Sequence, residues 1–384
     1  MSADKHIMII AGESSGDALG ADLMLALRAQ QSGVVITGIG GPKMSAAGLA
    51  SIFDMSEIAV MGLREILPRL PKLFKLVDQA VAHALASAPD ALVLIDSPEF
   101  NHRVAKRVKA KRPDLPIVCY VAPHVWAWRR GRAKKMKNYF DAVMAFLPFE
   151  PDVFAANDGP PCHFVGHPVR DRLDALQPLP DFAKRHRLKK HDVPLVIMPG
   201  SRISEVKSLS PVFGDVLRRL DGRIENLRPI IPLVPHMADI VREKTASWPG
   251  KPIYVEDEAE KLAAFKAARA ALASSGTATM ELALMGLPTV VAYDMGLMGD
   301  MLMRTMQVPS AVLVNLILDA PAMPEFLQWR CTPQEITPVL QAMLEDEEVH
   351  AQYQAVLAKF APAMRHEGQM PAERAAALTL DLAQ

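Results

Sequence analysis

Two acidic residues lie in a glycine-rich turn near the start of the chain, in the stretch AGESSGDALGA. The turn follows the apolar run HIMIIA and precedes apolar residues at helical spacing, so we expect a strand, a turn and a helix in succession. The turn lacks the G-x-x-x-x-G-K-[ST] and G-x-G-x-x-G spacings of nucleotide-binding loops, and Glu13 and Asp17 would repel a phosphate. The two carboxylates therefore either contact a polar substrate or favour the positive end of the following helix.

A second turn, in LVIMPGSRISEV, carries Arg202 where the first turn carries an acid. Ligands of parallel α/β sheets lie beyond the carboxyl ends of the strands, so a cation at this position suits a phosphate. Further along, ASSGTATMELAL places Ser275, Gly276 and Thr277 at a predicted helix start, where backbone N–H groups can bind an anion. Glu281, about one helical turn later, is either an acceptor for ribose hydroxyls or an ordinary helix charge. Together these residues indicate a sugar-nucleotide site in the second half of the chain.

The best candidate for a general base is Asp96, which ends the apolar run ALVLID. A carboxylate that follows a buried strand lies at the ligand-binding edge of the sheet, and a base positioned there contributes about 10²- to 10⁴-fold to a reaction. Asp96 could equally cap the helix that we expect to begin near Phe100. Glu13 is the second candidate for the base. His124, beside Trp126, is either a catalytic or a buried structural histidine.

The elements that must position these residues recur as short apolar runs with helical stretches between them, which predicts parallel sheets with right-handed crossovers. A polar, proline-marked region at about residues 166–194 separates two series of such runs. We expect an acceptor-binding Rossmann-like domain at residues 1–170, a nucleotide-binding one at 171–350 with a cleft between them, and a helical tail at 351–384 that returns to the first domain. The first series is HIMIIA, VVITGIG, ALVLID, PIVCYV and AVMAFL, and the second is PLVIMPG, RPIIPLV, PIYVED, AALASS and PTVVAY.

The bulk composition fits a globular chain of two domains. Of the 384 residues, 50% are hydrophobic and 22% are charged, and the formal net charge is 0, so no overall field attracts nucleic acid. The 3 cysteines are far apart, which offers no metal site and fits a reducing compartment. No apolar stretch reaches the roughly 18 to 20 residues that span a bilayer, and no leader precedes the first strand. We therefore expect a cytoplasmic protein without a metal or other cofactor.

Two basic stretches indicate contact with anionic groups other than nucleic acid. In AVMGLREILPRLPKLFKLV, Pro68 and Pro71 lead us to expect a helix that begins only near Pro71. Residues 60–69 either lie on an anionic membrane surface or pack on their own domain. The stretch VWAWRRGRAKKMK is either a solvated helix face or a contact for lipid or acceptor phosphates. A core-facing stripe on the first of these helices would consist of Leu70, Leu73, Phe74, Val77 and Val81.

Motifs along nearly the whole chain resemble those of the lipid-A-disaccharide synthase family, in that family's order. Single motifs also occur in related epimerases and peptidoglycan transferases, whereas the combination of AGESSGD, VWAWR and AFLPFE is specific. The motifs are AGESSGDALGA, AVMGLREIL, IDSPEFN, APHVWAWR, AFLPFE, FVGHP, MPGSR, SSGTATMELAL and PEFLQ.

The resemblance implies an α/β fold with two tandem Rossmann-like domains of the GT-B type and an inverting, metal-independent transferase. Diacylglucosamine would pass from UDP-2,3-diacylglucosamine to 2,3-diacylglucosamine 1-phosphate, releasing UDP, at the cytoplasmic face of the inner membrane. Substrate contacts are expected from Ser14, Asn315 and Gln328. We expect an anionic membrane surface as a partner and no nucleic acid, and we leave a homodimer open. The alternatives are an epimerase-like or other GT-B enzyme acting on a soluble sugar nucleotide, and a binding module without turnover.

Overall fold

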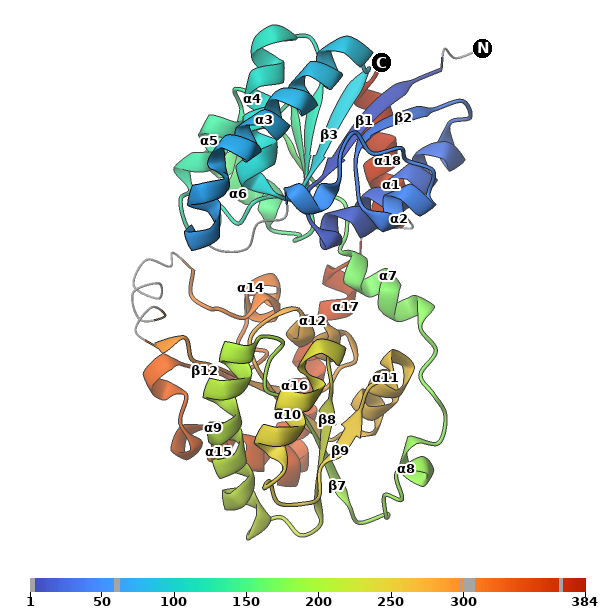
Figure 1. The fold of residues 1–384 in the computed structure, drawn as a ribbon. Coiled ribbons are helices and arrows are strands. Elements are labelled where there is room, and N and C mark those ends of the chain that lie inside the picture. Colours follow the sequence, from blue (N-terminus) through green and yellow to red (C-terminus); the bar gives the residue numbers. More distant parts are fainter. Residues whose placement is uncertain (1–3, 59–62, 297–298, 300–307, 366–368) are drawn as a thin grey trace. The chain divides into compact units, whose positions relative to one another are not determined.

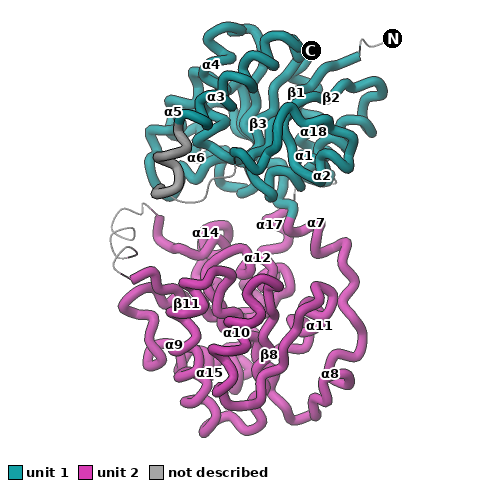
Figure 2. Tube along the Cα trace, in the orientation of Figure 1, with its two compact units in different colours: residues 1–168, 366–384 teal, residues 169–365 magenta. Residues whose placement is uncertain are grey.

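The computed structural model divides the chain into two compact units (Figure 2). Unit 1 consists of residues 1–168 and 366–384, and unit 2 of residues 169–365. Each unit is built on one six-stranded sheet in which all neighbouring strands are parallel. The structure describes residues 4–58, 63–296, 299, 308–365 and 369–384, and it does not describe the side chains of residues 63–70.

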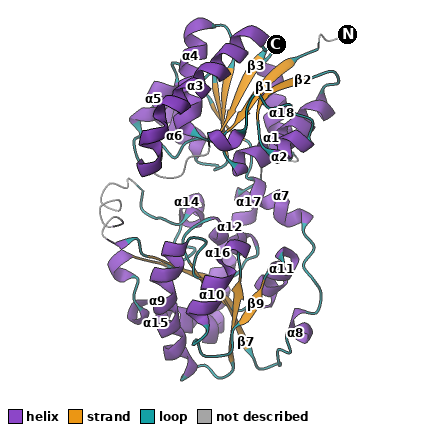
Figure 3. Cartoon of the chain, viewed as in Figure 1, coloured by secondary structure: helices purple, strands orange, loops and turns teal. Residues whose placement is uncertain are grey.

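The sheet of unit 1 has the strand order β2-β1-β3-β4-β5-β6, and helices flank it (Figures 1 and 3). Its central strands are continuous apolar runs because both faces of a parallel sheet are covered. The strands are β1 (His6–Ala11), β2 (Val35–Ile39), β3 (Ala91–Ile95), β4 (Ile117–Tyr120), β5 (Ala142–Ala145) and β6 (Cys162–Phe164). The helices are α1 (Ser14–Gln30), α2 (Pro42–Ala46), α3 (Leu63–Ser87), α4 (Pro98–Lys111), α5 (Gly131–Met136), α6 (Glu150–Ala156) and α18 (Pro371–Leu382).

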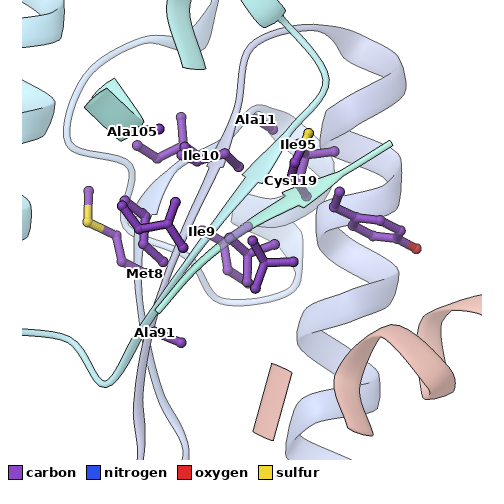
Figure 4. Close-up of a cluster of buried hydrophobic side chains, with 14 of the residues drawn as sticks. Met8, Ile9, Ile10, Ala11, Ala91, Ile95, Ala105 and Cys119 are labelled. Carbon is purple, nitrogen blue, oxygen red and sulfur yellow. The ribbon is translucent and has the colours of Figure 1, made fainter. Parts of the chain in front are cut away.

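The core of unit 1 gathers the inward side chains of the central strands (Figure 4). Ile9 and Ile10 of β1 and Ile95 of β3 are fully buried there. Burying a side chain of this size stabilises the fold by about 1.5 to 3 kcal/mol. This core holds the carboxyl ends of β1 and β3 in a fixed relation.

Helix α3 corrects our expectation that a helix begins only near Pro71. The helix begins at Leu63 and continues through Pro68 and Pro71 to Ser87. A proline in a helix interior costs about 3 kcal/mol because it removes a hydrogen bond and crowds the preceding turn. Buried side chains farther along α3 offset this cost, and they are Leu76, Val77, Ala80, Val81 and Ala84.

The predicted apolar stripe of α3 is correct only in part. Val77 and Val81 are buried and Leu73 packs against the core. Phe74, however, is 40% exposed and lies under the guanidinium groups of Arg103 and Arg107, at 5.7 and 5.9 Å from the ring centre. An aromatic ring at the surface can be covered by cations in this way. Leu70 and the proposed membrane segment, residues 60–69, lie outside the side chains that the structure describes.

The sheet of unit 2 has the strand order β12-β11-β10-β7-β8-β9. Its strands are β7 (Val193–Met198), β8 (Leu227–Pro232), β9 (Ile253–Val255), β10 (Ala270–Ala273), β11 (Thr289–Tyr293) and β12 (Glu325–Leu327). The helices include α7 (Pro168–Ala175), which begins at the last residue of unit 1, and α8 (Phe182–Arg185), α9 (Ile203–Asp221), α10 (Ala238–Thr245), α11 (Glu258–Ala267), α12 (Thr277–Leu284), α14 (Leu313–Leu318), α15 (Pro333–Glu345), α16 (Glu347–Leu357) and α17 (Phe360–Ala363).

In the C-terminal tail, the boundary between unit 2 and unit 1 lies after residue 365, later than the expected boundary at residue 351. Helices α16 and α17 belong to unit 2 because Leu357 and Phe360 are buried in its core. Among the described helices of the tail, α18 belongs to unit 1, where it packs against α1. Ala375 and Ala376 of α18 are fully buried in the core of unit 1.

Candidate active site

The strand order of unit 1 reverses between β1 and β3, where crossovers leave in opposite directions. Such a switch point opens a crevice beyond the carboxyl ends of the two strands. Ala11 of β1 pairs with Ile95 of β3, so the turns that follow these strands begin side by side. Gly12 makes this possible, because a Cβ at that position would lie 2.5 Å from the Cβ of Ser97. The turns with Glu13 and Asp96 therefore meet at the switch point of unit 1.

Asp96 is held by its backbone. Its N–H donates to the carbonyl oxygen of Tyr120 at 3.0 Å, and its carbonyl oxygen accepts from Nδ2 of Asn101 at 2.8 Å. The residue has a φ of +51°, a left-handed conformation that costs energy and is maintained by these bonds. Helix α4 begins at Pro98 with Ser97 as its N-cap, and within the described residues no side chain caps it. The helix-cap alternative for Asp96 therefore finds no support, and its half-buried carboxylate stays our candidate base.

Glu13 and Ser14 lie at the start of α1, where both reach the surface, although neighbouring atoms keep part of the water from the Glu13 carboxylate. Partial burial, and then the negative charge of Asp96, raise the pKa of Glu13. The two carboxylates are thus close enough to influence one another. A role for Glu13 as the base and for Ser14 in substrate binding stays a prediction.

Asp17 is a buried structural residue, so of the two alternatives stated for it, contact with a substrate finds no support. Its side chain is 3% exposed, and its carboxylate accepts from the backbone N–H groups of Gly41, Lys43 and Met44 at 2.7, 2.9 and 3.0 Å. These groups belong to the start of α2, whose first N–H groups have no partner within the helix. Asp17 therefore joins α1 to α2.

We predict that Asp17→Ala lowers the free energy of unfolding by about 2 kcal/mol, because buried N–H groups lose their acceptor. Urea unfolding monitored by circular dichroism measures this change. Asp22→Ala, an exposed change in the same helix, is the control and should stay within about 0.5 kcal/mol of the wild type. Equal stability of the two variants would contradict this role for Asp17.

The side chain of His124 is exposed, so it is not the buried structural histidine of one alternative, and a catalytic role stays a prediction. Its ring packs against that of Trp126, with 5.3 Å between ring centres. Partial desolvation by the surrounding protein lowers the pKa of His124, and Asp96 only partly opposes this effect. The ring is therefore uncharged at neutral pH.

Glu150 ends the motif AFLPFE, but it was not among the candidate residues named from the sequence. Its carboxylate is 2% exposed and accepts from Nε1 of Trp126 at 3.1 Å and from the N–H of Leu147 at 3.0 Å. Burial raises its pKa to about 7. Glu150 thereby ties the loop after β4, which carries His124, to the loop after β5.

The basic stretch at residues 125–137 has a mixed environment. The guanidinium group of Arg129 lies 4.5 Å from the ring centre of Trp128, which is 46% exposed. Lys134 and Lys137 both pair with Asp158. Part of the positive charge is therefore neutralised within unit 1, as expected for a solvated helix face.

The strand order of unit 2 reverses between β7 and β10, which creates a second switch point. Met198 of β7 pairs with Ala273 of β10, and the N–H of Ser274 donates to the carbonyl oxygen of Met198 at 2.9 Å. The loop after β7 leads into α9, and the loop after β10 leads into α12. The starts of two helices thus follow neighbouring strands, and the start of a helix offers N–H groups that have no partner within the helix and the positive end of its dipole.

Arg202 is the N-cap residue of α9, at the first of these helix starts. Its side chain is 73% exposed, and one Nη atom lies 2.7 Å from the carboxylate of Glu205. A guanidinium group has five N–H donors in a planar fork. Arg202 therefore has donors left for an anion after it has bonded to Glu205.

The loop after β10 contains the predicted residues Ser275, Gly276 and Thr277. Oγ of Ser275 donates to the carbonyl oxygen of Ala311 at 3.1 Å, while Gly276 and Thr277 are exposed. A Cβ at Gly276 would meet no atom of the described residues within 4 Å. The backbone at the start of α12 is thus open to a ligand.

Glu281 is buried in α12 and is not an ordinary surface charge. Its side chain is 6% exposed, with Nζ of Lys261 at 3.1 Å from one oxygen and a guanidinium nitrogen of Arg172 on the other. Spacing in the sequence could not have linked these partners, which come from α11 and α7. A bond from Glu281 to a ribose stays a prediction.

Asn315 and Gln328 both form hydrogen bonds within unit 2. Nδ2 of Asn315 donates to the carbonyl oxygen of Met323 and its Oδ1 accepts from the N–H of Met323, both at 2.8 Å. The amide of Gln328 bonds to the N–H of Met295 and to the carbonyl oxygen of Gly296, also at 2.8 Å. Both side chains therefore order loops near β11 and β12, and direct contact of either one with a substrate stays a prediction.

In the part of the chain that is described, no helix combines the length and the apolar character needed to cross a membrane. The described residues also contain no group of three or more His, Cys, Asp or Glu side chains that could hold a metal ion.

Two parallel six-stranded Rossmann-like units, each with polar residues at its switch point, define a GT-B fold. Solved structures share this fold. The structure of MurG from Acinetobacter baumannii has a TM-score of 0.59 at 14% identity, with 98% of this chain and 99% of that chain covered. A UDP co-structure of MnaA from S. aureus has a TM-score of 0.60 at 15% identity, with 92% and 91% covered. At these identities, the similarity shows the fold alone.

The sequence comparisons define the family. A model of the lipid-A-disaccharide synthetase family matches residues 7–379. A lipid-A-disaccharide synthase of Bradyrhizobium diazoefficiens is 42% identical over 98% of this chain and 96% of that protein. Another, of Rhodospirillum centenum, is 44% identical over 88% and 85%.

The chain belongs to the lipid-A-disaccharide synthase family, and it is a glycosyltransferase of lipid A biosynthesis. The resemblance found in the sequence is thereby confirmed. The epimerase-like alternative has support only at the level of the fold, from neighbours such as a UDP-GlcNAc 2-epimerase of Neisseria meningitidis at 11% identity.

Proposed function

We propose that this chain transfers diacylglucosamine from UDP-2,3-diacylglucosamine to 2,3-diacylglucosamine 1-phosphate, with unit 2 binding the donor and unit 1 the acceptor. The observation that carries this assignment is the opposite chemistry of the two switch points. Unit 1 has Glu13 and Asp96 there, whereas unit 2 has Arg202 and the start of α12. A diphosphate requires cations and N–H donors, while an attacking hydroxyl requires a base.

On the donor side, the guanidinium group of Arg202 pairs with the diphosphate, and the N–H groups after Gly276 add hydrogen bonds. Glu281 accepts hydrogen bonds from the ribose hydroxyls, and these bonds replace part of its interaction with Arg172. Arg172 can yield because its side chain is 55% exposed and so regains water. The positive charge of Arg202 stabilises the transition state more than the bound donor, because negative charge grows on the leaving UDP as its bond to the sugar breaks.

On the acceptor side, Asp96 takes the proton of the acceptor hydroxyl as its oxygen attacks the anomeric carbon. Attack on the face opposite the departing diphosphate inverts the configuration at that carbon. Because Arg202 and two helix starts supply the positive potential, we propose that the reaction needs no metal ion.

One assay tests the proposal. The full chain is incubated with UDP-diacylglucosamine and diacylglucosamine 1-phosphate, with and without EDTA, and the products are identified by mass spectrometry. We expect the acylated disaccharide phosphate and UDP in equal amounts, at a rate that EDTA leaves unchanged. UDP-N-acetylglucosamine alone is the control, since its 2-epimer would be formed by an epimerase. Absence of the disaccharide, or a rate abolished by EDTA and restored by a divalent metal, would contradict the proposal.

We further propose that the chain works at the cytoplasmic face of the inner membrane, held by residues 60–69. Both substrates carry acyl chains, and each buried methylene contributes about 0.8 kcal/mol, so these lipids seldom leave a bilayer. Basic side chains near an anionic surface add roughly 1 kcal/mol each and lose this contribution as salt screens them.

We predict that the double change Met61→Ser, Leu63→Ser reduces sedimentation with anionic vesicles, and that salt weakens binding of the wild type. The matched control is Leu25→Ser, Val35→Ser, which alters two apolar side chains of unit 1 that are 58% and 50% exposed. Thermal melting checks that both variants fold. Equal sedimentation of both variants and the wild type at every salt concentration would show that residues 60–69 pack on their own unit.

A further inference from the structure

Glu205 in the first turn of α9 is a buried carboxylate with three partners. It accepts from the backbone N–H of Ser201 at 2.9 Å, from Nη1 of Arg202 at 2.7 Å and from the hydroxyl of Tyr293 at 3.1 Å. Its side chain is 7% exposed, whereas that of Arg202 is 73% exposed. A carboxylate is removed from water at a high cost unless such bonds replace its hydration. The three donors together meet this requirement.

These bonds join two loops that are not neighbours in the sheet. Ser201 and Arg202 follow β7, while Tyr293 ends β11, and β10 lies between these two strands. Burial, and then Glu205, raise the pKa of Tyr293, so its hydroxyl stays protonated and can donate. The hydrogen bond to Glu205 raises the pKa of Arg202. Glu205 thus connects the guanidinium group of Arg202, which follows β7, to Tyr293 at the end of β11.

The backbone of the loop also depends on Glu205. Gly200 has a φ of +128°, and a Cβ there would lie 2.4 Å from the Cβ of Glu205 and 2.6 Å from one of its carboxylate oxygens. Only glycine allows both this conformation and this close approach. The glycine of the motif MPGSR therefore makes room for the carboxylate as well as for the turn.

We infer that Glu205 is a positioning residue, which fixes the direction of the Arg202 guanidinium group and the shape of the loop at residues 199–202 for the diphosphate of the donor. The inference rests on the proposed function, in which Arg202 meets that diphosphate. Glu205 itself does not touch the substrate, because its oxygens are buried behind Ser201 and Arg202. Its bond occupies one nitrogen of the planar guanidinium group, and because the Arg202 side chain is 73% exposed, other donors of the fork remain for phosphate oxygens.

The test is Glu205→Gln, which keeps the shape and an acceptor oxygen but removes the negative charge that holds Arg202. We expect UDP affinity, measured by calorimetry, to fall about tenfold, since the ion pair is replaced by a weaker hydrogen bond from the charged guanidinium group to a neutral amide oxygen. Affinity for uridine, measured by competition, should change less than twofold because uridine lacks the phosphates. Asp215→Asn removes an exposed carboxylate of the same helix, which pairs with Arg218, and serves as the matched control with unchanged UDP affinity.

Tyr293→Phe supplies an independent variant that removes one donor to Glu205 and keeps the ring. We expect a loss of about threefold in UDP affinity, and less than the product of the two losses when it is combined with Glu205→Gln, because the groups form one network. Equal losses for UDP and uridine, or additive losses in the double variant, would show a general role in folding and overturn the inference.

Arg202→Ala separates this inference from the proposed function. If Arg202→Ala leaves UDP affinity unchanged, the proposed donor site is wrong. If Arg202→Ala weakens UDP binding and Glu205→Gln does not, the donor site stands and Glu205 is no positioning residue.

Discussion

Asp96→Asn is expected to lower kcat by about 10²-fold or more while the protein folds normally, because the amide keeps the shape of the side chain and cannot take a proton. The backbone bonds of Asp96 to Tyr120 and Asn101 do not involve the carboxylate, so they persist in the variant. Turnover with both acylated substrates measures the loss, and thermal melting measures the fold. Asp114→Asn, an exposed change in the same unit, should leave turnover unchanged.

A near-normal rate for Asp96→Asn would transfer the role of base to Glu13. The pH dependence of kcat then becomes informative, because burial and Asp96 raise the pKa of Glu13. A base with a raised pKa is protonated, and the rate falls, at a higher pH than for an ordinary glutamate. Replacing Asp96 by Asn removes one of these causes, so the acidic limb of the profile would move to lower pH. An unchanged acidic limb in an active Asp96→Asn variant would exclude Glu13 as well.

Arg202→Ala is expected to lower kcat/KM by about 10²- to 10³-fold and to weaken UDP binding, because the same charge meets the donor and the developing leaving group. Calorimetry with UDP and initial-rate kinetics with both substrates measure the two effects. Arg202→Lys should recover only part of the loss, since an ammonium group is a point charge without the planar fork that Glu205 aligns.

The matched control for this change is Arg218→Ala near the other end of α9, where the guanidinium group makes an exposed pair with Asp215. It should alter neither UDP affinity nor kcat/KM. If the Arg202→Ala variant bound UDP as tightly as the wild type, Arg202 would not be part of the diphosphate site.

The strands were largely predictable because the apolar runs of a parallel sheet are continuous in the sequence. Ten predicted runs correspond to β1–β5 and β7–β11. The missed strands, β6 and β12, have three residues each and lie at sheet edges. Each of them contains a polar residue, His163 in β6 and Glu325 in β12, so neither forms an apolar run, whereas the equally short edge strand β9 is the run Ile-Tyr-Val and was predicted.

Local sequence also determined the chemistry of the turns. The glycine-rich turn with Glu13 is acidic and the turn with Arg202 is cationic whatever fold the chain adopts. This difference distinguishes an acidic first half of the chain from a cationic second half. The sequence alone likewise determined the family, since its motifs extend along the chain and match relatives over nearly their whole length.

Only the tertiary structure decided which residues act together. Strand pairing brings Glu13 to Asp96, and the packing of α1 on α2 turns Asp17 into a structural residue. The cluster of Arg202, Glu205 and Tyr293 likewise depends on strand order, because β10 separates the strands that carry it. Local patterns record whether a side chain is buried, but they carry no information on its partners from distant segments. Those partners are set by strand register and by crossovers, which exist only once the sheet has formed.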